Sequence, residues 1–416
     1  MFRADELDRA GQLRISATTQ DHVNGLKGLS ALLPCPKFDI CLGFVIDYML
    51  CVLLGVVPKY IDLIYEFKKG RIISDRRLSE VDVRLEALTP DIVSVGPRPL
   101  SARGDFKAKE FRALLLYYIL PCMRGILKDR YFENLRKFVT AIHILLRDCI
   151  LSADLDEADR LLKSFVKEFK ELFGDDNMVH NLHLCTHLVM MVRMWGPLWA
   201  YSAISFESGN KNLLKLNSGT RGVATQLALK YCMSRTVAKC MAKSEVSADI
   251  LDFRSEVVST SYANKTSEDY GSARAHREVV KIVSTDEAQA LSTAGYEVPR
   301  LLVYFNWVLR KRVWYYSRGY SKPTVYDDSC ICLNDRTYAQ IWKIVKLPNV
   351  DGLGVLIRPI RIAAVSHFAP HIKSCSGDMF EPLKLIHFDD VKIKCALLKV
   401  ETKSYVCYIA NFYEVH

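Results

Sequence analysis

Apolar residues recur at spacings of three and four through much of residues 43–241, which is typical of helices that bury one face. The clearest run follows Asp154, which resembles a capping box with Glu157, and it ends at Gly174. Further helices are predicted over 43–67 with a break at Pro58, 107–127 with an interruption at Pro121, 131–149, 177–194 and part of 211–241. Their short connections indicate an antiparallel helical bundle.

Near Leu301 the pattern changes to short runs of Tyr, Val, Ile and Trp that are divided by Gly, Pro, Asp and Asn. Such runs predict strands, here over 313–316, 339–345, 353–362, 393–400 and 405–409. We therefore expect an α+β protein whose N-terminal two-thirds are mainly α-helical and whose small C-terminal module is β-rich. The predicted organisation is an irregular segment over 1–34, a helical region over 35–242, a linker with loose helix over 243–298 and the β-rich module over 299–416.

Composition narrows the class of protein. Half of the 416 residues are apolar and a quarter are charged, as in globular proteins, and the net charge of +10 permits an anionic partner such as DNA. The 13 cysteines are scattered without CxxC pairs, which favours the nucleus or the cytoplasm over secretion. The apolar stretch 40–57 contains Asp47 and is short for a membrane span, so we expect a buried helix and no membrane partner.

Two carboxylates stand beside apolar runs, where an unpartnered charge is costly to desolvate. Asp47 lies within GFVIDYMLCVLLGV (43–56), and Glu207 follows the aromatic run WGPLWAYSAISF (195–206). Each is a candidate metal ligand, because a divalent ion offsets the cost of burying a carboxylate. The alternative for Asp47 is an N-cap, and the alternative for Glu207 is an acid at the start of a helix.

A histidine cluster lies within the helix predicted over 177–194. His183 and His187 are four residues apart and share one helical face with room for a common metal ion, with His180 and Cys185 nearby. No acid stands between them, which excludes the HExxH metalloprotease pattern. The alternative is a set of hydrogen-bonded helix histidines.

The segment 300–322 combines cations with aromatic residues and contains no acid. Its cations are Arg300, Arg310, Lys311, Arg312, Arg318 and Lys322. Cations neutralise phosphate and exposed aromatic rings stack on bases, so this segment is a candidate nucleic-acid surface. The alternative is that the aromatic residues form the core of the β-rich module and the cations only its solvated face.

An ordered series of short motifs runs through residues 22–240. They are NGLKGLS (24–30), FDI (38–40), GFVIDYM (43–49), VLLGV (52–56), a segment over 111–127 ending in LPCMRGIL, NLH (181–183) with His187, and GPLW (196–199) leading to Phe206 and Glu207. With this series the chain resembles the transposases of CACTA (En/Spm-like) DNA transposons, in the form common in animal genomes.

The resemblance implies a remnant of an RNase H-like core with a helical insertion, which in the family cuts and joins DNA with three carboxylates and two divalent metals. By this resemblance Glu207 matches the third carboxylate and Asp47 matches the acid of a D-x-x-H signature, whose histidine is replaced here by Leu50. The family's first two catalytic aspartates lie upstream of this region, and the 34 residues before Cys35 are too few for the strands that carry them.

We therefore expect a truncated or decayed copy, or a fragment of a longer protein, that binds DNA in the nucleus without transposition activity. Mg²⁺ or Mn²⁺ would be needed only if activity remains, because two-metal hydrolysis requires several carboxylates. Two alternatives stay open. One is a metal-dependent DNA nuclease or strand transferase that uses Asp47 and Glu207, with His183 or His187 as further ligands. The other is a protein-interaction scaffold with no nucleic-acid role.

Overall fold

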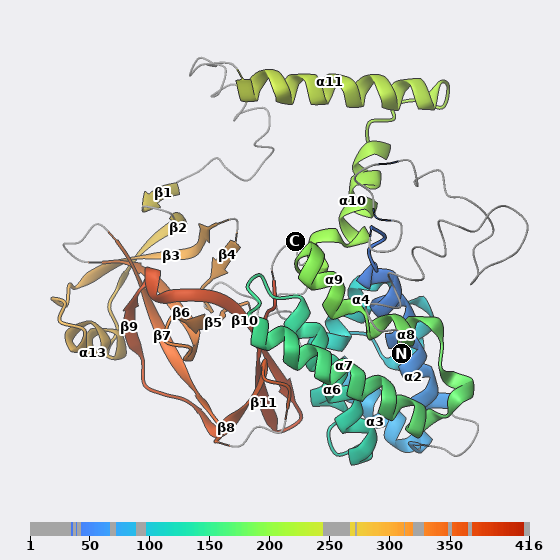
Figure 1. Ribbon diagram of the computed structural model, residues 1–416. Coiled ribbons are helices and arrows are strands. Elements are labelled where there is room, and N and C mark those ends of the chain that lie inside the picture. The colour runs from blue at the N-terminus through green and yellow to red at the C-terminus, as the bar shows by residue number, and fades with distance from the viewer. Residues whose placement is uncertain are drawn as a thin grey trace, which may run out of the picture.

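The computed structural model describes residues 35, 39, 43–66, 72–88, 97–243, 267–270, 273–311, 313–318, 328–347, 352–364 and 368–411. The fold is mixed α and β, with helices in the N-terminal part and a large antiparallel sheet in the C-terminal part (Figure 1). We call residues 43–243 the helical half and residues 267–411 the sheet half. The segment 1–34, predicted to be irregular, lies outside the described residues.

The helical half has helices within each of the predicted ranges, and further helices over 75–86 and 203–210 that the pattern did not predict. In chain order its elements are η1 (Met49–Val56), α2 (Val57–Glu66), α3 (Asp75–Glu86), η2 (Leu100–Asp105), α4 (Ala108–Ala113), η3 (Leu114–Tyr118), α5 (Ile119–Met123), α6 (Asp129–Leu145), α7 (Ser152–Phe173), η4 (Asp175–Asn177), α8 (His180–Cys185), α9 (Leu188–Trp195), η5 (Leu198–Tyr201), α10 (Ala203–Leu214) and α11 (Val223–Lys243). None of the helices among the described residues is both long enough and apolar enough to cross a membrane.

The two prolines predicted to interrupt helices each follow a stretch of π-helix. Pro58 lies just after η1 and Pro121 lies three residues after η3. A proline lacks the amide hydrogen and crowds the carbonyl of the preceding turn, and a wider π turn changes the hydrogen-bond pattern there. The chain therefore changes its type of helix at these prolines and continues.

Helix α7 carries the predicted apolar face into the centre of the helical half. Phe165 stacks on Phe138 of α6 with ring centroids 4.4 Å apart, and Phe169 lies 5.8 Å from the ring of Tyr60 on α2. Gly174 ends the helix with a φ of 86°, which favours glycine. The predicted capping register is wrong by a few residues: Asp154 Oδ2 accepts from the amide of Leu151, so the helix begins at Ser152.

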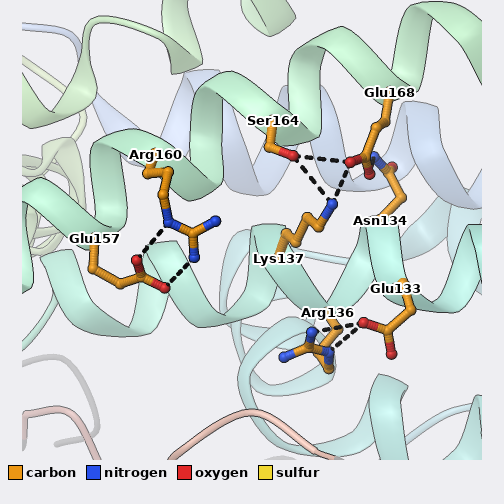
Figure 2. A network of polar contacts seen from close by, with 8 residues as sticks. All are labelled: Glu133, Asn134, Arg136, Lys137, Glu157, Arg160, Ser164 and Glu168. Carbon is orange, nitrogen blue, oxygen red and sulfur yellow. Dashed lines mark hydrogen bonds and ion pairs between the residues drawn. The ribbon is translucent and has the colours of Figure 1, made fainter.

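A polar network also joins α6 to α7 along their exposed edge (Figure 2). Lys137 forms an ion pair with Glu168 and donates to Ser164 Oγ at 3.1 Å, while Asn134 donates to the carbonyl of Phe165 at 3.0 Å. Burial alone would raise the pKa of Glu168, but hydrogen bonds from Lys137, Ser164 and Asn134 outweigh it and lower the pKa. The network fixes the register of the two longest helices of the core.

The sheet half contains the predicted strands and others that the pattern missed. Its elements are β1 (Ser267–Tyr270), β2 (Ala273–Ile282), α13 (Thr285–Thr293), β3 (Leu301–Arg310), β4 (Val313–Tyr316), β5 (Cys330–Leu333), β6 (Tyr338–Lys346), β7 (Leu353–Ile362), β8 (Ile372–Phe380), β9 (Lys384–His387), η6 (Phe388–Asp390), β10 (Val391–Val400) and β11 (Lys403–Tyr408). The described part of the expected linker over 243–298 thus holds β1, β2 and α13 in place of loose helix. Strand β2 forms because it pairs with β3 along its whole length.

Six of the described strands close into a ring. The strand order is β1-β2-β3-β6-β5-β10-β11-β8-β7-β9, and an additional pairing of β6 with β7 joins the two ends of β6-β5-β10-β11-β8-β7. We call this ring the barrel. Side chains from every one of its strands meet in one apolar cluster that fills its interior: Cys330, Cys332, Tyr338, Ile360, Cys375, Cys395 and Val406.

The outer face of the barrel packs on the helical half. Alternate residues of β10 and β11, among them Leu398, Tyr405 and Cys407, belong to the same buried core as the residues of α6 and α7. His143 of α6 stacks on His371, which precedes β8, with ring centroids 3.7 Å apart and planes at 4°. The helical half and the barrel therefore share one core.

Truncation of Ile372, which is fully buried at this junction, should lower the unfolding free energy by about 2–5 kcal/mol. Ile372→Ala should still unfold in a single urea transition, because both halves depend on the same core. The control is Ile282→Ala, whose side chain is 68% exposed and should cost little. Two separate transitions in the wild-type protein would contradict a shared core.

Acidification should weaken the same junction through the stacked histidines. Burial lowers the pKa of His143, with His371 contributing, and burial lowers the pKa of His371 to about 3. Because the unfolded chain takes up protons near pH 6.5 and the folded protein does not, stability falls as the pH drops below about 6.5, by about 2 kcal/mol per histidine at pH 5. His371→Gln should remove about half of this pH dependence in urea denaturation; an unchanged dependence would contradict it.

Candidate functional site

Asp47 caps two helices with one carboxylate. It stands just before η1, where its Oδ1 accepts from the amide of Leu50 at 2.7 Å. Its Oδ2 accepts from the amide of Ala203, the first residue of α10, at 2.5 Å. Burial, together with the nearby Asp47 carboxylate, raises the pKa of Tyr201. This geometry agrees with the alternative that Asp47 is a helix cap, and the hydrogen bond from Ala203 also joins α10 to the rest of the helical half.

Glu207 lies on α10 with an exposed side chain. It is one helical turn beyond Ala203, which is about 6 Å along the helix axis, so it is not an acid of the first turn. The structure therefore brings Asp47 and Glu207 to the same end of one helix although they are far apart in sequence. Within the described chain no polar contact to the Glu207 carboxylate is present.

The histidine cluster spans a helix break. The single helix predicted over 177–194 is wrong: α8 ends at Cys185 and α9 begins at Leu188, so His183 lies in α8 and His187 lies in the turn before α9. Their Nε2 atoms are 3.3 Å apart and form a hydrogen bond, as the alternative predicts. Burial lowers the pKa of His187, and the neighbouring His183 adds to this effect.

No group of three or more His, Cys, Asp or Glu side chains in the described ranges is placed to hold a metal ion. The structure pairs His183 with His187 and places Asp47 and Glu207 at the same end of α10, but it does not unite the four residues in one centre.

The basic and aromatic segment 300–322 divides between core and surface. Arg310 is buried, donates to the carbonyls of Phe388, at 3.0 Å, and Val391, and lies over the ring of Phe388. Arg310 therefore forms hydrogen bonds inside the protein and is not available to bind a phosphate. Arg300 and Lys311 are exposed, whereas Arg312 and Lys322 lie outside the described residues. Among the aromatic residues, Phe305 and Tyr315 belong to the buried core, as the alternative predicts.

Arg318 belongs to a cationic surface on the barrel side of the sheet half. The guanidinium carbons of Arg318 and Arg358 lie 5.6 Å and 4.2 Å from the centroid of the Trp342 ring. These residues line a hollow of about 420 Å³ together with Asp286 and with Lys343, which is paired with Glu287. Arg318 also donates to Gln340 Oε1 at 2.7 Å. No carboxylate of the described residues pairs with Arg358. We call Arg318, Trp342 and Arg358 the Arg–Trp surface; it presents guanidinium donors beside an aromatic ring.

Helix α11 was missed as a functional candidate. It extends away from the rest of the helical half and from the sheet half at the top of Figure 1, and none of its side chains that the structure describes is buried. The segment between Glu207 and Glu245 contains no carboxylate and seven cations: Lys211, Lys215, Arg221, Lys230, Arg235, Lys239 and Lys243. This one-sided charge was visible in the sequence, and it indicates an anionic partner.

No family model, curated protein or solved structure significantly matches the chain. The residues themselves therefore define the candidate surfaces, which are the end of α10 with Asp47 and Glu207, the Arg–Trp surface, and the cationic segment 208–244 that includes α11.

Loss of the Asp47 carboxylate should destabilise the protein more than loss of the Glu207 carboxylate. Asp47→Ala removes acceptors from the first turns of two helices and should lower the unfolding free energy by about 1–2 kcal/mol in urea denaturation. Glu207→Ala is the matched control and should change it by less than about 0.5 kcal/mol, because the side chain is exposed. The reverse order would contradict the capping role.

Proposed function

We propose that this protein binds duplex DNA through segment 208–244, and that it is a transposase-derived nuclear protein without transposition activity. The observation that carries the proposal is the absence of any carboxylate between Glu207 and Glu245, in a segment with seven cations whose described part of α11 is exposed. Such a segment is attracted to a phosphate backbone without any internal acid to compete for its cations.

The dimensions of α11 suit the same partner. A helix of 21 residues is about 31 Å long at 1.5 Å per residue, close to one turn of B-DNA. The major groove of B-DNA is wide enough to admit an α-helix. The exposed Arg235 and Lys239 are four residues apart, so they lie on one face of α11. Together these features support binding of α11 along the groove or the flanking phosphates.

The Arg–Trp surface supports a second contact. Arg358 stacks on Trp342 and is not neutralised by a carboxylate of the described residues. A guanidinium held on an aromatic ring keeps its donors in a fixed plane, which suits bidentate contact with a phosphate. In this proposal the Arg–Trp surface provides part of the phosphate binding that the sequence pattern predicted for segment 300–322.

The transposase origin rests on the resemblance of the ordered motifs, with the helical half as a remnant of an RNase H-like core. The loss of activity is supported by the use of Asp47, whose two oxygens accept backbone hydrogen bonds at the starts of η1 and α10. Charge-based binding does not require a catalytic centre, so it persists without the chemistry.

One observation favours the alternative of a metal-dependent nuclease. Asp47 accepts from the first amide of α10, and Glu207 lies on the same helix about one turn beyond that amide. Cleavage of supercoiled plasmid with Mg²⁺ or Mn²⁺, abolished by Glu207→Gln, would establish that alternative and overturn the proposal of binding without cutting.

The proposal predicts DNA binding that weakens steeply with salt. In fluorescence anisotropy with a labelled duplex, the double variant Arg235→Gln/Lys239→Gln should reduce the slope of log affinity against log salt by about 0.9 for each phosphate that the variant no longer neutralises. The control Lys109→Gln/Lys167→Gln removes two exposed cations from the helical half and should leave the slope unchanged. Absence of binding at low salt, or binding that salt does not weaken, would contradict the proposal.

A further inference from the structure

A cavity of about 500 Å³ opens where the barrel meets the helical half. The end of α6 and the start of α7 form one side, and the barrel strands β5, β6, β10 and β11 form the other. The mouth of a β-barrel is a common place for a small-molecule site, and this volume lies within the usual range for such sites.

Three cations from different elements line this cavity. Arg147 forms an ion pair with Asp154 at 3.2 Å, whereas neither Arg336 nor Lys392 has a carboxylate partner among the described residues. Two carboxylates, Asp148 and Asp154, also line the cavity, so the three cations outnumber them by one. A hydrogen bond from Cys395 lowers the pKa of Cys332 against the opposing effect of burial, and Lys392 adds to the lowering. The cavity therefore has a positive wall that is only partly neutralised.

The stacked histidines form another wall. His371 Nε2 lies 2.9 Å from the carbonyl of Leu116, and a carbonyl only accepts, so Nε2 carries the proton and Nδ1 is an acceptor. His371 is 3% exposed and its Nδ1 has no hydrogen-bond partner. A buried acceptor without a donor is costly, and a ligand that supplies a donor here would remove that cost.

Tyr338 and Tyr408 complete the lining with two aromatic side chains. We propose that this cavity binds a small phosphate-bearing molecule with a planar ring, of the size of a nucleoside monophosphate. Arg336 and Lys392 bind the phosphate, the tyrosines contact the ring, and a donor group of the ligand approaches the histidine pair. The site uses no residue of segment 208–244 and is independent of the proposed DNA binding.

Calorimetric titration of the full chain with adenosine monophosphate tests the site. Binding should weaken at least tenfold in Arg336→Gln/Lys392→Gln and should be unchanged in Lys399→Gln/Lys403→Gln, which alters two exposed lysines of β10 and β11 outside the cavity. Adenosine and inorganic phosphate should each bind more weakly than the intact nucleotide, because each lacks one half of the recognised groups.

An internal control separates binding in the cavity from binding elsewhere. Cys149 is exposed and lines the cavity, whereas Cys232 is exposed on α11. Adenosine monophosphate should slow alkylation of Cys149 by iodoacetamide and leave Cys232 unaffected, as measured by mass spectrometry. Absence of binding at millimolar nucleotide, equal weakening in both double variants, or equal protection of both cysteines would overturn the proposal.

Discussion

The fold depends on the double use of β10 and β11. Because side chains alternate across a strand, Cys395 and Val406 belong to the cluster inside the barrel while Leu398 and Cys407 belong to the core of the helical half. A shift of pairing by one residue would exchange these two sets and disrupt both cores together. The two strands therefore fix the position of the helical half relative to the barrel. The positions of the surfaces around the junction follow from this packing.

This arrangement places three candidate binding surfaces in different parts of the molecule. Segment 208–243, which includes α11, lies outside the shared core and presents cations to solvent. The Arg–Trp surface lies on the sheet half and combines charge with stacking. The cavity at the barrel mouth lies directly at the junction, where the packing of helices against strands leaves room for a small ligand and for the buried histidine pair.

Local patterns predicted the elements whose apolar face is continuous. Helix α7 has such a face and a glycine end, and strand β7 was predicted with its observed bounds because it is apolar along much of its length. Strand β2 was missed because half of its residues are polar, so its pattern resembles a linker. Its pairing with β3 decides its structure. Long-range pairing of this kind is weakly encoded in local propensity.

The candidate site was predictable only in part. Asp47 and the His183–His187 pair were identified from spacing and apolar context, and the structure assigns both to hydrogen bonds that the alternatives described. The hydrogen bond from the Ala203 amide to Asp47 depends on how α10 packs, so the sequence around neither residue predicts it. Arg310 was chosen for its charge, but burial under Phe388 decides its role.

The sensitivity of the thiols inside the barrel to oxidation changes as the protein folds. In the folded protein Cys330 and Cys395 are buried and form no disulfide, and buried thiols in apolar surroundings react slowly. In a newly synthesised or refolding chain the same side chains are open to oxidants and to one another. A reducing environment therefore protects the barrel thiols chiefly before the ring of strands has closed, whereas the exposed Cys149 and Cys232 need it in the folded protein as well.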